Sequence, residues 1–206
     1  MPTPNEIFTN ALKQHAPEFG VELSSDSLSA LNKYYALILK WNPRLHLVAP
    51  CSPEEFATRH VLESLLLLNH LPPNARVADV GSGAGLPMIP CLILRDDLRA
   101  ILIESSSKKS VFLREALRLI DSEERVQVVT ARFEDILAPD VDFITCRALD
   151  RFSDLLTDLI NWSPPEAVLL FFVGGALRDR ITSALPQSQV DRIPRSENRF
   201  LVVAKR

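Results

Sequence analysis

Cysteine is scarce in this chain of 206 residues, and its three copies are far apart. Cys51, Cys91 and Cys146 form no C-x-x-C pair, and an odd number cannot all pair with one another. Disulfide frameworks and structural zinc sites depend on paired, closely spaced cysteines. The sequence therefore argues against both kinds of site and is typical of a protein from a reducing compartment.

The chain also lacks a long hydrophobic run and a basic N-terminal segment followed by an apolar one. A membrane-spanning helix needs about 18 or more apolar residues in succession, and a secretory signal needs the second pattern. We therefore expect a cytoplasmic protein with no membrane span, no metal and no partner protein. Because the net charge is −3, a nucleic-acid ligand would need a local basic patch.

Glycine is scarce as well, with six copies, but three of them lie within Val77–Pro87. This segment reads V-A-D-V-G-S-G-A-G-L-P, an apolar run followed by alternating glycines and a proline. The pattern predicts a buried parallel strand, a tight turn and then a helix. Glycine permits positive φ and close approach of a ligand to the backbone. The helix that follows would direct unpaired N–H groups toward that ligand.

The spacing of these glycines separates two classes of cofactor site. Dinucleotide-binding folds use G-x-G-x-x-G. Here Gly81, Gly83 and Gly85 follow Asp79 as D-x-G-x-G-x-G, and Leu86 stands at the third dinucleotide position. The pattern resembles the first motif of Rossmann-like methyltransferases, which bind S-adenosylmethionine. Taken alone, it also leaves open a glycine turn that binds no ligand.

A second acidic residue favours the cofactor site. Glu104 closes an apolar run that starts at Arg99, and it lies 19 positions after Gly85 (104 − 85). In nucleotide-binding α/β folds, an acid about 20 residues after the glycine turn accepts hydrogen bonds from the ribose hydroxyls. We favour this role, although the serines that follow leave open an ordinary position beside a helix N-cap.

The N-terminal part of the chain carries helical patterns only. Capping residues and three- and four-residue spacing predict helices over 4–15, over 26–42 and from residue 53 onward. The pair Asn42-Pro43 is expected to end the second helix. We expect residues 1–73 to form a helical extension that serves as an RNA platform or a lid.

From residue 74 onward, strand and helix patterns alternate, which predicts a parallel sheet with right-handed crossovers. The expected strands are 76–80, 99–104, 126–130, 141–146 and 167–173, and the expected helices are 88–95, 107–120, 151–162 and 176–185. Two further runs, 188–193 and 199–204, predict a terminal hairpin. We therefore expect an α/β, Rossmann-like class I methyltransferase fold with a seven-stranded, mostly parallel sheet and a C-terminal antiparallel hairpin. Residues 74–206 would form the S-adenosylmethionine-binding domain, packed with the extension as one unit.

Several short motifs follow one another between about Leu31 and the hairpin. They are Lys40-Trp41-Asn42, His46-Leu47, Arg59-His60-x-x-Glu63-Ser64, Asp79 to Pro90, Lys108-Lys109-x-x-Phe112-Leu113, Arg132-Phe133-Glu134 and Arg147-Ala148. Taken in order, these motifs resemble one family, the bacterial 16S rRNA guanine-N7 methyltransferases (RsmG, also called glucose-inhibited division protein B).

The resemblance implies a 16S rRNA (guanine(527)-N7)-methyltransferase that uses S-adenosylmethionine and releases S-adenosylhomocysteine. Its partner would be 16S rRNA or the small ribosomal subunit. The expected cofactor contacts are Asp79, Gly81, Gly83, Gly85, Leu86, Glu104, Phe133, Glu134 and Arg147. Arg147 is also the best candidate for orienting the reactants. A salt bridge from Arg147 to Asp150 or Asp154 is the structural alternative.

The expected RNA-binding patch combines basic residues of the N-terminal helices with those of helix 107–120. Its main members are Lys40, Arg44, Arg59, Lys108 and Lys109, with Lys33 and Arg114 beside them. Tyr34, Tyr35 and Trp41 lie among the first group and could stack on unpaired bases. Because their helical spacing is typical of core residues, we expect at most one of these three aromatic side chains to be exposed.

Methylation of guanine N7 needs no general base, because N7 carries a lone pair and no proton. The enzyme must hold N7 in line with the methyl group and exclude water. The N-P-P-Y type of motif found in amino-methylating enzymes is absent, and Thr145-Cys146-Arg147-Ala148 stands in its place. We therefore assign no catalytic base.

Two rival readings concern individual side chains. Cys146 could act as a nucleophile, as in cytosine-C5 methyltransferases, but an unpaired cysteine is more often a small buried hydrophobic residue. His46 and His60 could act as a base or as metal ligands, but no third ligand is suitably spaced, which favours a core or interface role. Arg59 and Glu63 have the spacing of an i,i+4 helix pair.

The chain departs from the family pattern at three places. It has His46-Leu47-Val48 where the family usually has Asn-Leu-Thr, and Glu63 where the family has aspartate. Val173-Gly174 replaces a lysine-glycine pair, which removes a cation near the substrate side. Two other functions stay open: a small-molecule methyltransferase and a non-enzymatic RNA-binding protein with a decayed site. The basic N-terminal helices weigh against the first, and the intact glycine motif weighs against the second.

Overall fold

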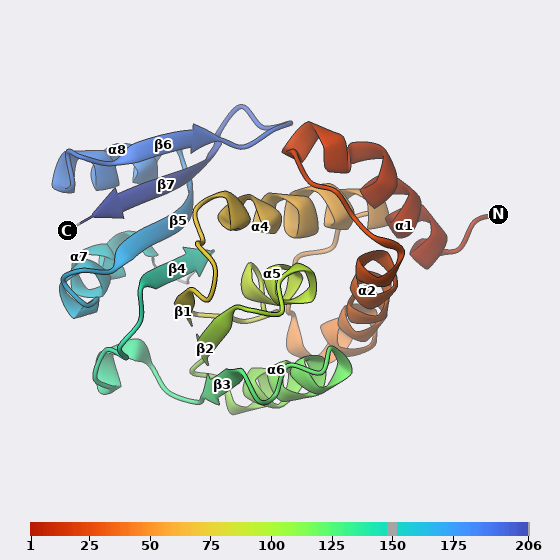
Figure 1. Cartoon of the computed structure of the whole chain (residues 1–206), viewed down its shortest axis with the longest axis horizontal. Coiled ribbons are helices and arrows are strands. Elements are labelled where there is room, and N and C mark those ends of the chain that lie inside the picture. Colours follow the sequence, from red (N-terminus) through yellow and green to blue (C-terminus); the bar gives the residue numbers. More distant parts are fainter. Residues whose placement is uncertain (148–151, 206) are drawn as a thin grey trace.

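A seven-stranded sheet runs through the centre of the molecule (Figure 1). The structure is a computed structural model that describes residues 1–147 and 152–205. Its strands are β1 (Arg76–Val80), β2 (Arg99–Ile103), β3 (Val126–Val129), β4 (Phe143–Arg147), β5 (Val168–Gly174), β6 (Gln189–Arg192) and β7 (Arg199–Lys205). They lie in the order β3-β2-β1-β4-β5-β7-β6.

The first five strands are parallel, and β7 pairs antiparallel with both β5 and β6. The predicted class I methyltransferase fold, with its C-terminal antiparallel hairpin, is therefore confirmed. In strand β1, Val77 packs into a core on one face of the sheet and Ala78 into a core on the other. A parallel strand covered on both faces has no exposed side that needs polar residues.

Helices cover both faces of the sheet. They are α1 (Pro4–His15), α2 (Ser25–Leu45), α3 (Pro53–Glu55), α4 (Glu63–Leu65), α5 (Met88–Leu94), α6 (Ser107–Leu119), α7 (Phe152–Trp162) and α8 (Gly175–Ala184), with short turns η1 (Ala16–Phe19), η2 (Phe56–Leu62), η3 (Leu66–Asn69) and η4 (Phe133–Asp135). The larger core cluster joins α1, α2, α5 and α6 to one face, and the smaller one joins α7 and α8 to the other. No helix in the described ranges is long and apolar enough to cross a membrane.

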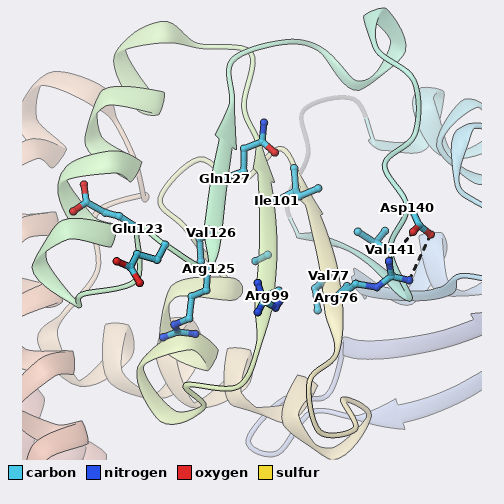
Figure 2. Close-up of a pocket in the computed structure, with 12 residues that line it drawn as sticks. Arg76, Val77, Arg99, Ile101, Glu123, Arg125, Val126, Gln127, Asp140 and Val141 are labelled. Carbon is cyan, nitrogen blue, oxygen red and sulfur yellow. Dashed lines mark hydrogen bonds and ion pairs between the residues drawn. The ribbon is translucent and has the colours of Figure 1, made fainter.

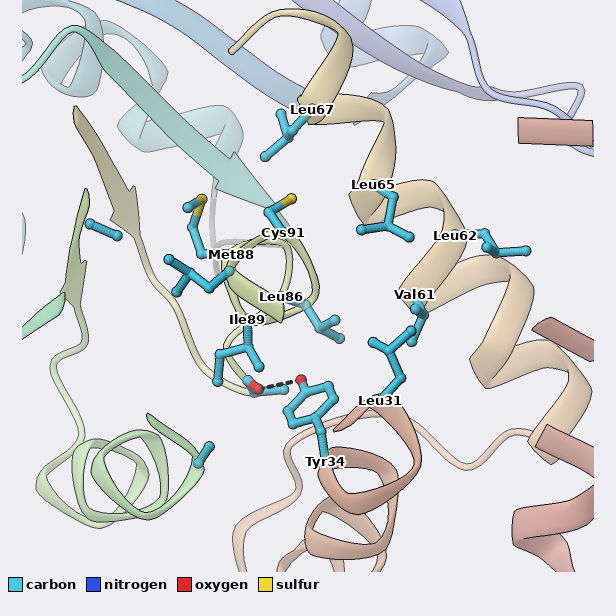
Figure 3. Close-up of a cluster of buried hydrophobic side chains, with 14 of the residues drawn as sticks. Leu31, Tyr34, Val61, Leu62, Leu65, Leu67, Leu86, Met88, Ile89 and Cys91 are labelled. Carbon is cyan, nitrogen blue, oxygen red and sulfur yellow. Dashed lines mark hydrogen bonds between the residues drawn. The ribbon is translucent and has the colours of Figure 1, made fainter. Parts of the chain in front are cut away.

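The N-terminal helices are part of the larger core. Figure 3 shows Leu31 and Tyr34 of α2 facing Leu86 and Ile89, which follow the first strand. Val61 of η2 joins them from a third element. Apolar side chains from residues 1–73 and from the sheet domain thus form one buried cluster.

Two N-terminal details differ from the sequence predictions. Helix α2 does not end at Asn42-Pro43 but continues to Leu45, and His46 then takes a left-handed φ of 47°. Proline in the last turn removes a single N–H donor. The Asn42 side chain bonds the backbone N–H and carbonyl of Val48, which fixes the chain just beyond the helix. The segment from residue 53 to residue 69 is helical throughout, but η2 within it has the wider π-helical turns.

Candidate active site at the carboxyl edge of the sheet

The glycine loop leaves β1 at the carboxyl edge of the sheet, where ligands bind in open α/β folds. Gly81, Gly83 and Gly85 have φ values of 74°, 51° and 81°, a left-handed region that residues with a Cβ rarely adopt. The loop is tied to the neighbouring strand, because the Gly81 and Ser82 N–H groups both donate to the Ile103 carbonyl, at 2.9 and 3.1 Å. The positions of the three glycines are therefore set by backbone geometry.

Glu104 closes the other side of this loop. Its side chain is buried, with Oε2 accepting from the Gly83 N–H at 2.8 Å and Oε1 accepting from the Ser106 N–H at 2.7 Å. A carboxylate oxygen has two lone pairs, so each retains capacity for one more donor. The two oxygens therefore lie against the loop itself, where ribose hydroxyls could add to the bonds already present.

The surroundings of two glycines test whether the loop can receive a ligand. A Cβ on Gly83 would meet only the Gly81 carbonyl oxygen, at 3.7 Å, so this side of the loop faces open space. A Cβ on Gly85 would lie 2.3 Å from Ile89 Cδ1, so this glycine is required by packing against the helix below. The loop fits a ligand that lies against the backbone at Gly83.

Asp79 lies beneath the loop and is fully buried. Neither carboxylate oxygen has a hydrogen-bond partner within the described part of the chain. The Ser82 hydroxyl donates to the backbone carbonyl of Asp79 instead, at 2.9 Å. Burial raises the pKa of Asp79 to about 8, and the nearby Glu104 charge adds to the rise. Asp79 is thus a mostly neutral, unpartnered carboxyl group at pH 7.

Leu86, Phe133 and Glu134 occupy different environments. The side chain of Leu86 lies in the larger core cluster and not at an exposed lip. Phe133 is buried with its ring edge-on to Trp162, at 5.5 Å between centroids. Glu134 is exposed and pairs with Arg132 at 2.8 Å, which helps to keep its pKa below the usual value despite partial burial.

Arg147 ends β4, but its guanidinium turns toward the N-terminal helical segment. It donates to the Glu63 carboxylate at 3.1 Å, to the Ser64 hydroxyl at 3.2 Å and to the carbonyls of Arg59 and His60 at 2.5 and 3.4 Å. The expected alternative partner Asp150 lies outside the described residues. The Arg147 side chain is only 11% exposed, so these bonds form in a largely dry environment.

Glu63 is the partner that the sequence analysis missed. Its carboxylate is 2% exposed and lies between Arg147 and Arg199, whose Nη2 is 2.6 Å away. The expected pair between Arg59 and Glu63 is wrong: Arg59 bonds Glu55 instead, at 2.9 Å. The wider turns of η2 change which residues share a helix face.

The candidate RNA-binding residues lie on exposed surface of three elements. Lys40 and Arg44 are on α2, Arg59 is on η2, and Lys108 and the half-buried Lys109 are at the start of α6, beside Glu104. Lys40 reaches Glu115 of α6 at 3.1 Å, so the two helices meet on this surface. Lys33 and Arg114 are also exposed, and Arg114 donates to the Val128 carbonyl at 3.2 Å.

The aromatic side chains of α2 are not available for stacking. Tyr34 and Tyr35 are buried, and Trp41 is half-buried, with its ring edge-on to Phe112. None of the three is exposed, which agrees with their helical spacing.

Three side chains were considered as an alternative nucleophile, base or metal ligand: Cys146, His46 and His60. Two of them lie away from open solvent. Cys146 is fully buried in the smaller core cluster. His60 is half-buried, and burial followed by the nearby Arg147 and Arg59 charges lowers its pKa to about 3. His46 is exposed, so it does not occupy a core position. In the described ranges, no three His, Cys, Asp or Glu side chains are grouped to hold a metal ion.

A cavity lies at the opposite edge of the sheet (Figure 2). Its volume is about 420 Å³, and it is lined at the amino ends of β1, β2 and β3 by Arg76, Arg99, Arg125 and their neighbours. Arg76 is held there by Asp140 at 2.7 Å. This cavity is separate from the glycine loop, and it combines charges of both signs.

Comparisons of sequence agree with this geometry. Residues 27–202 match the family described as GidB, rRNA small subunit methyltransferase G. The Chromobacterium violaceum protein named Ribosomal RNA small subunit methyltransferase G is 38% identical over 152 residues, 73% of this chain and 72% of its own length. The Xanthomonas axonopodis pv. citri protein of that name is 39% identical over 170 residues, 80% of this chain and 79% of its own.

Solved structures share the fold at low sequence identity. A ribosomal protein L11 methylase from Lactobacillus delbrueckii subsp. bulgaricus aligns with a TM-score of 0.58 at 17% identity, over 72% of this chain and 79% of that one. The M. jannaschii TYW2 in complex with AdoMet aligns at 0.57 and 16% identity, over 70% and 74%. These likenesses show the fold alone, whereas the sequence matches confirm the predicted family. The chain therefore belongs to the rRNA small subunit methyltransferase G family.

Proposed function

We propose that this protein methylates N7 of a guanine in 16S rRNA, using S-adenosylmethionine and releasing S-adenosylhomocysteine. The guanine is the one at position 527. The observation that carries the proposal is the contact between Glu104 and the Gly83 N–H, in a chain of this family. It closes a glycine loop whose outer side is open at the carboxyl edge of the sheet.

The residues that would hold the cofactor surround this loop. Glu104 would accept from the ribose hydroxyls, and the loop backbone at Gly81, Gly83 and Gly85 would lie against the amino-acid part of the ligand. Phe133 and Glu134 follow β3 at the same edge and would bind the adenine. Asp79 and Leu86 would act from beneath the loop, since their side chains are buried.

When bound, S-adenosylmethionine supplies an electrophilic methyl group. The protein's own residues then have to orient guanine N7 and exclude water, because N7 has no proton to remove. We assign no catalytic base. Arg147 acts as a positioning residue, because its donors fix the end of β4 against Glu63 and the helical segment above.

Residues 1–73 would serve as an RNA platform that packs on the methyltransferase domain, residues 74–206. The exposed cations Lys40, Arg44 and Arg59 would contact phosphates of the rRNA or of the small ribosomal subunit, together with Lys108 and Lys109 beside the cofactor site. Val173 stands at the end of β5 where the family pattern has a lysine, so this strand end lacks that cation. Arg199, the first residue of β7, pairs with Gly174 of the neighbouring β5 and brings a cation to the same strand end.

The test is a methyl-transfer assay with radiolabelled S-adenosylmethionine and two substrates, naked 16S rRNA and small subunits from cells that lack this gene. We expect 7-methylguanosine at position 527 in at least one of them. Binding of S-adenosylhomocysteine without transfer to either substrate would favour a small-molecule methyltransferase. No binding by calorimetry at millimolar ligand would favour a decayed site.

A further inference from the structure

A tyrosine of the N-terminal helical part reaches the glycine loop. Tyr34 of α2 is fully buried, and its hydroxyl donates to the backbone carbonyl of Ala84 at 2.7 Å (Figure 3). Burial raises the pKa of Tyr34 far above its usual value, so the hydroxyl keeps its proton and remains a donor. Ala84 lies between Gly83 and Gly85, at the centre of the loop.

The peptide that joins Ala84 to Gly85 is held at both ends. Its carbonyl accepts from Tyr34, and its N–H, on Gly85, donates to the Ser82 carbonyl at 2.6 Å. Ala84 stands between Gly83 and Gly85, which both have positive φ, and Gly85 has no side chain to restrict rotation of this peptide. The peptide needs outside contacts to keep one orientation, and Tyr34 supplies the only side-chain bond to its carbonyl among the described residues.

The other fixed points of the loop come from the sheet side. Gly81 and Ser82 are bonded to Ile103, and Gly83 is bonded to Glu104. Tyr34 approaches from α2, the helix that also carries Lys33 and Lys40 on its exposed side. The same helix therefore contacts the cofactor loop on one side and presents candidate RNA-binding cations on the other.

We infer that Tyr34 is a positioning residue for the cofactor loop, which sets the Ala84–Gly85 peptide in the orientation that receives S-adenosylmethionine. It acts through the backbone and does not touch the ligand. Through it, the N-terminal part influences cofactor affinity as well as RNA binding. The identity of the ligand rests on the proposed function, whereas the role in holding the loop does not.

The neighbouring tyrosine provides a matched control. Tyr35 is also buried on α2, but its ring contacts are with Phe8, at 4.3 Å between centroids, and with Phe56. Tyr34→Phe and Tyr35→Phe each remove one tyrosine hydroxyl from the same helix. Only the first leaves the Ala84 carbonyl without its donor.

Two measurements test the inference. Hydrogen exchange on the ligand-free protein should show faster exchange of the amides at residues 83–86 in Tyr34→Phe and no change there in Tyr35→Phe. Calorimetry with S-adenosylhomocysteine should show about tenfold weaker binding for Tyr34→Phe and less than twofold for Tyr35→Phe. In turnover, Tyr34→Phe should raise KM for S-adenosylmethionine more than it lowers kcat.

The outcomes separate this inference from the proposed function. Unchanged loop exchange in Tyr34→Phe, or equal affinities in the two variants, would overturn the role of Tyr34. A wild-type protein that binds no S-adenosylhomocysteine would overturn the proposed function, and exchange would then decide alone whether Tyr34 holds the loop. Unfolding curves for both variants check that affinity is compared between equally folded proteins.

Discussion

The guanidinium of Arg147 donates to the carboxylate of Glu63 at 3.1 Å, and this contact ties the end of β4 to the N-terminal helical segment. Both side chains are nearly inaccessible, at 11% and 2% exposure. Removing one partner of a buried ion pair leaves the other charge uncompensated, which costs far more than breaking a surface pair. The pair therefore makes the N-terminal part necessary to the stability of the sheet edge.

Arg147→Met should lower the free energy of unfolding by about 3 kcal/mol, because Glu63 keeps only Arg199 as a partner and two helix carbonyls lose their donor. The control is Arg132→Met, which breaks the exposed pair with Glu134 and should cost less than about 1 kcal/mol. Urea unfolding of both variants gives the comparison. Equal losses of unfolding free energy in the two variants would show that the buried Arg147 pair stabilises the protein no more than an exposed pair does.

Gly85→Ala should destabilise the protein by about 2 to 4 kcal/mol, through backbone strain at a φ of 81° and a clash with Ile89. Gly20→Ala is the control, because Gly20 has a φ of 67° with nothing within 4 Å of the added Cβ. It should cost only the strain, about 1 kcal/mol. Thermal or urea unfolding measures both, and a smaller loss for Gly85→Ala would contradict the packing argument.

Glu104→Gln should weaken binding of S-adenosylhomocysteine about 10- to 100-fold. Glutamine has one acceptor oxygen, so its amide NH₂ would face either the Gly83 or the Ser106 N–H, and the charge-assisted bonds to the ribose would be lost. Glu115→Gln, on the adjacent helix, should leave the affinity unchanged. Titration calorimetry distinguishes the two, and full affinity in Glu104→Gln would remove the ribose role.

Asp79→Asn should change how stability depends on pH. Because the pKa of Asp79 is raised to about 8, the folded protein retains a proton between about pH 4 and pH 8 that the unfolded chain releases. Wild-type stability therefore falls as the pH rises through this window, and the variant lacks this loss. As the pH rises through this window, the unfolding free energy of Asp79→Asn minus that of the wild type should increase by up to about 1.4 kcal/mol per pH unit.

The control for this experiment is Asp142→Asn. Hydrogen bonds from Arg76 lower the pKa of Asp142, so its stabilising effect is fully present at pH 5 and declines only under more acidic conditions. The free energy of unfolding of Asp142→Asn should therefore differ from that of the wild type by a constant amount between pH 5 and pH 8. Parallel behaviour of the two variants in this range would refute the assignment of the proton to Asp79.

Cys146→Ala should retain methyl transfer at the wild-type level, because the thiol is fully buried in the smaller core cluster. We expect a loss of about 1 kcal/mol in stability from the smaller side chain. Product formation is measured at saturating cofactor. Complete loss of turnover in a folded variant would restore the nucleophile hypothesis.

Local patterns were sufficient to predict the strands, the glycine loop and the place of Glu104. Each depends on residues within a few positions, since β1 needs apolar side chains on both faces and the loop needs positive φ. The end of α2 was less predictable, because Pro43 weakens a final turn without preventing it.

The polar contacts around Arg147 could not be predicted in the same way. Glu63 and Arg199 are 136 positions apart, and only the tertiary fold brings them together. The i,i+4 spacing of a regular α-helix predicted a pair between Arg59 and Glu63. It does not apply across the wider turns of η2, where Arg59 pairs with Glu55. The burial of Asp79 follows from the helices that cover it, and nothing in its neighbouring residues marks its carboxyl group as unpartnered.

The strand order β5-β7-β6 makes β7 the link between the parallel strands and the outermost strand at this edge of the sheet. Strand β6 precedes β7 in the chain but pairs with the sheet only through it, so the attachment of the outermost strand depends on the later one. Arg199 is the first residue of β7 and arrives with it. A deletion within β7 would therefore detach two strands at once and leave Glu63 with half of its counter-charge.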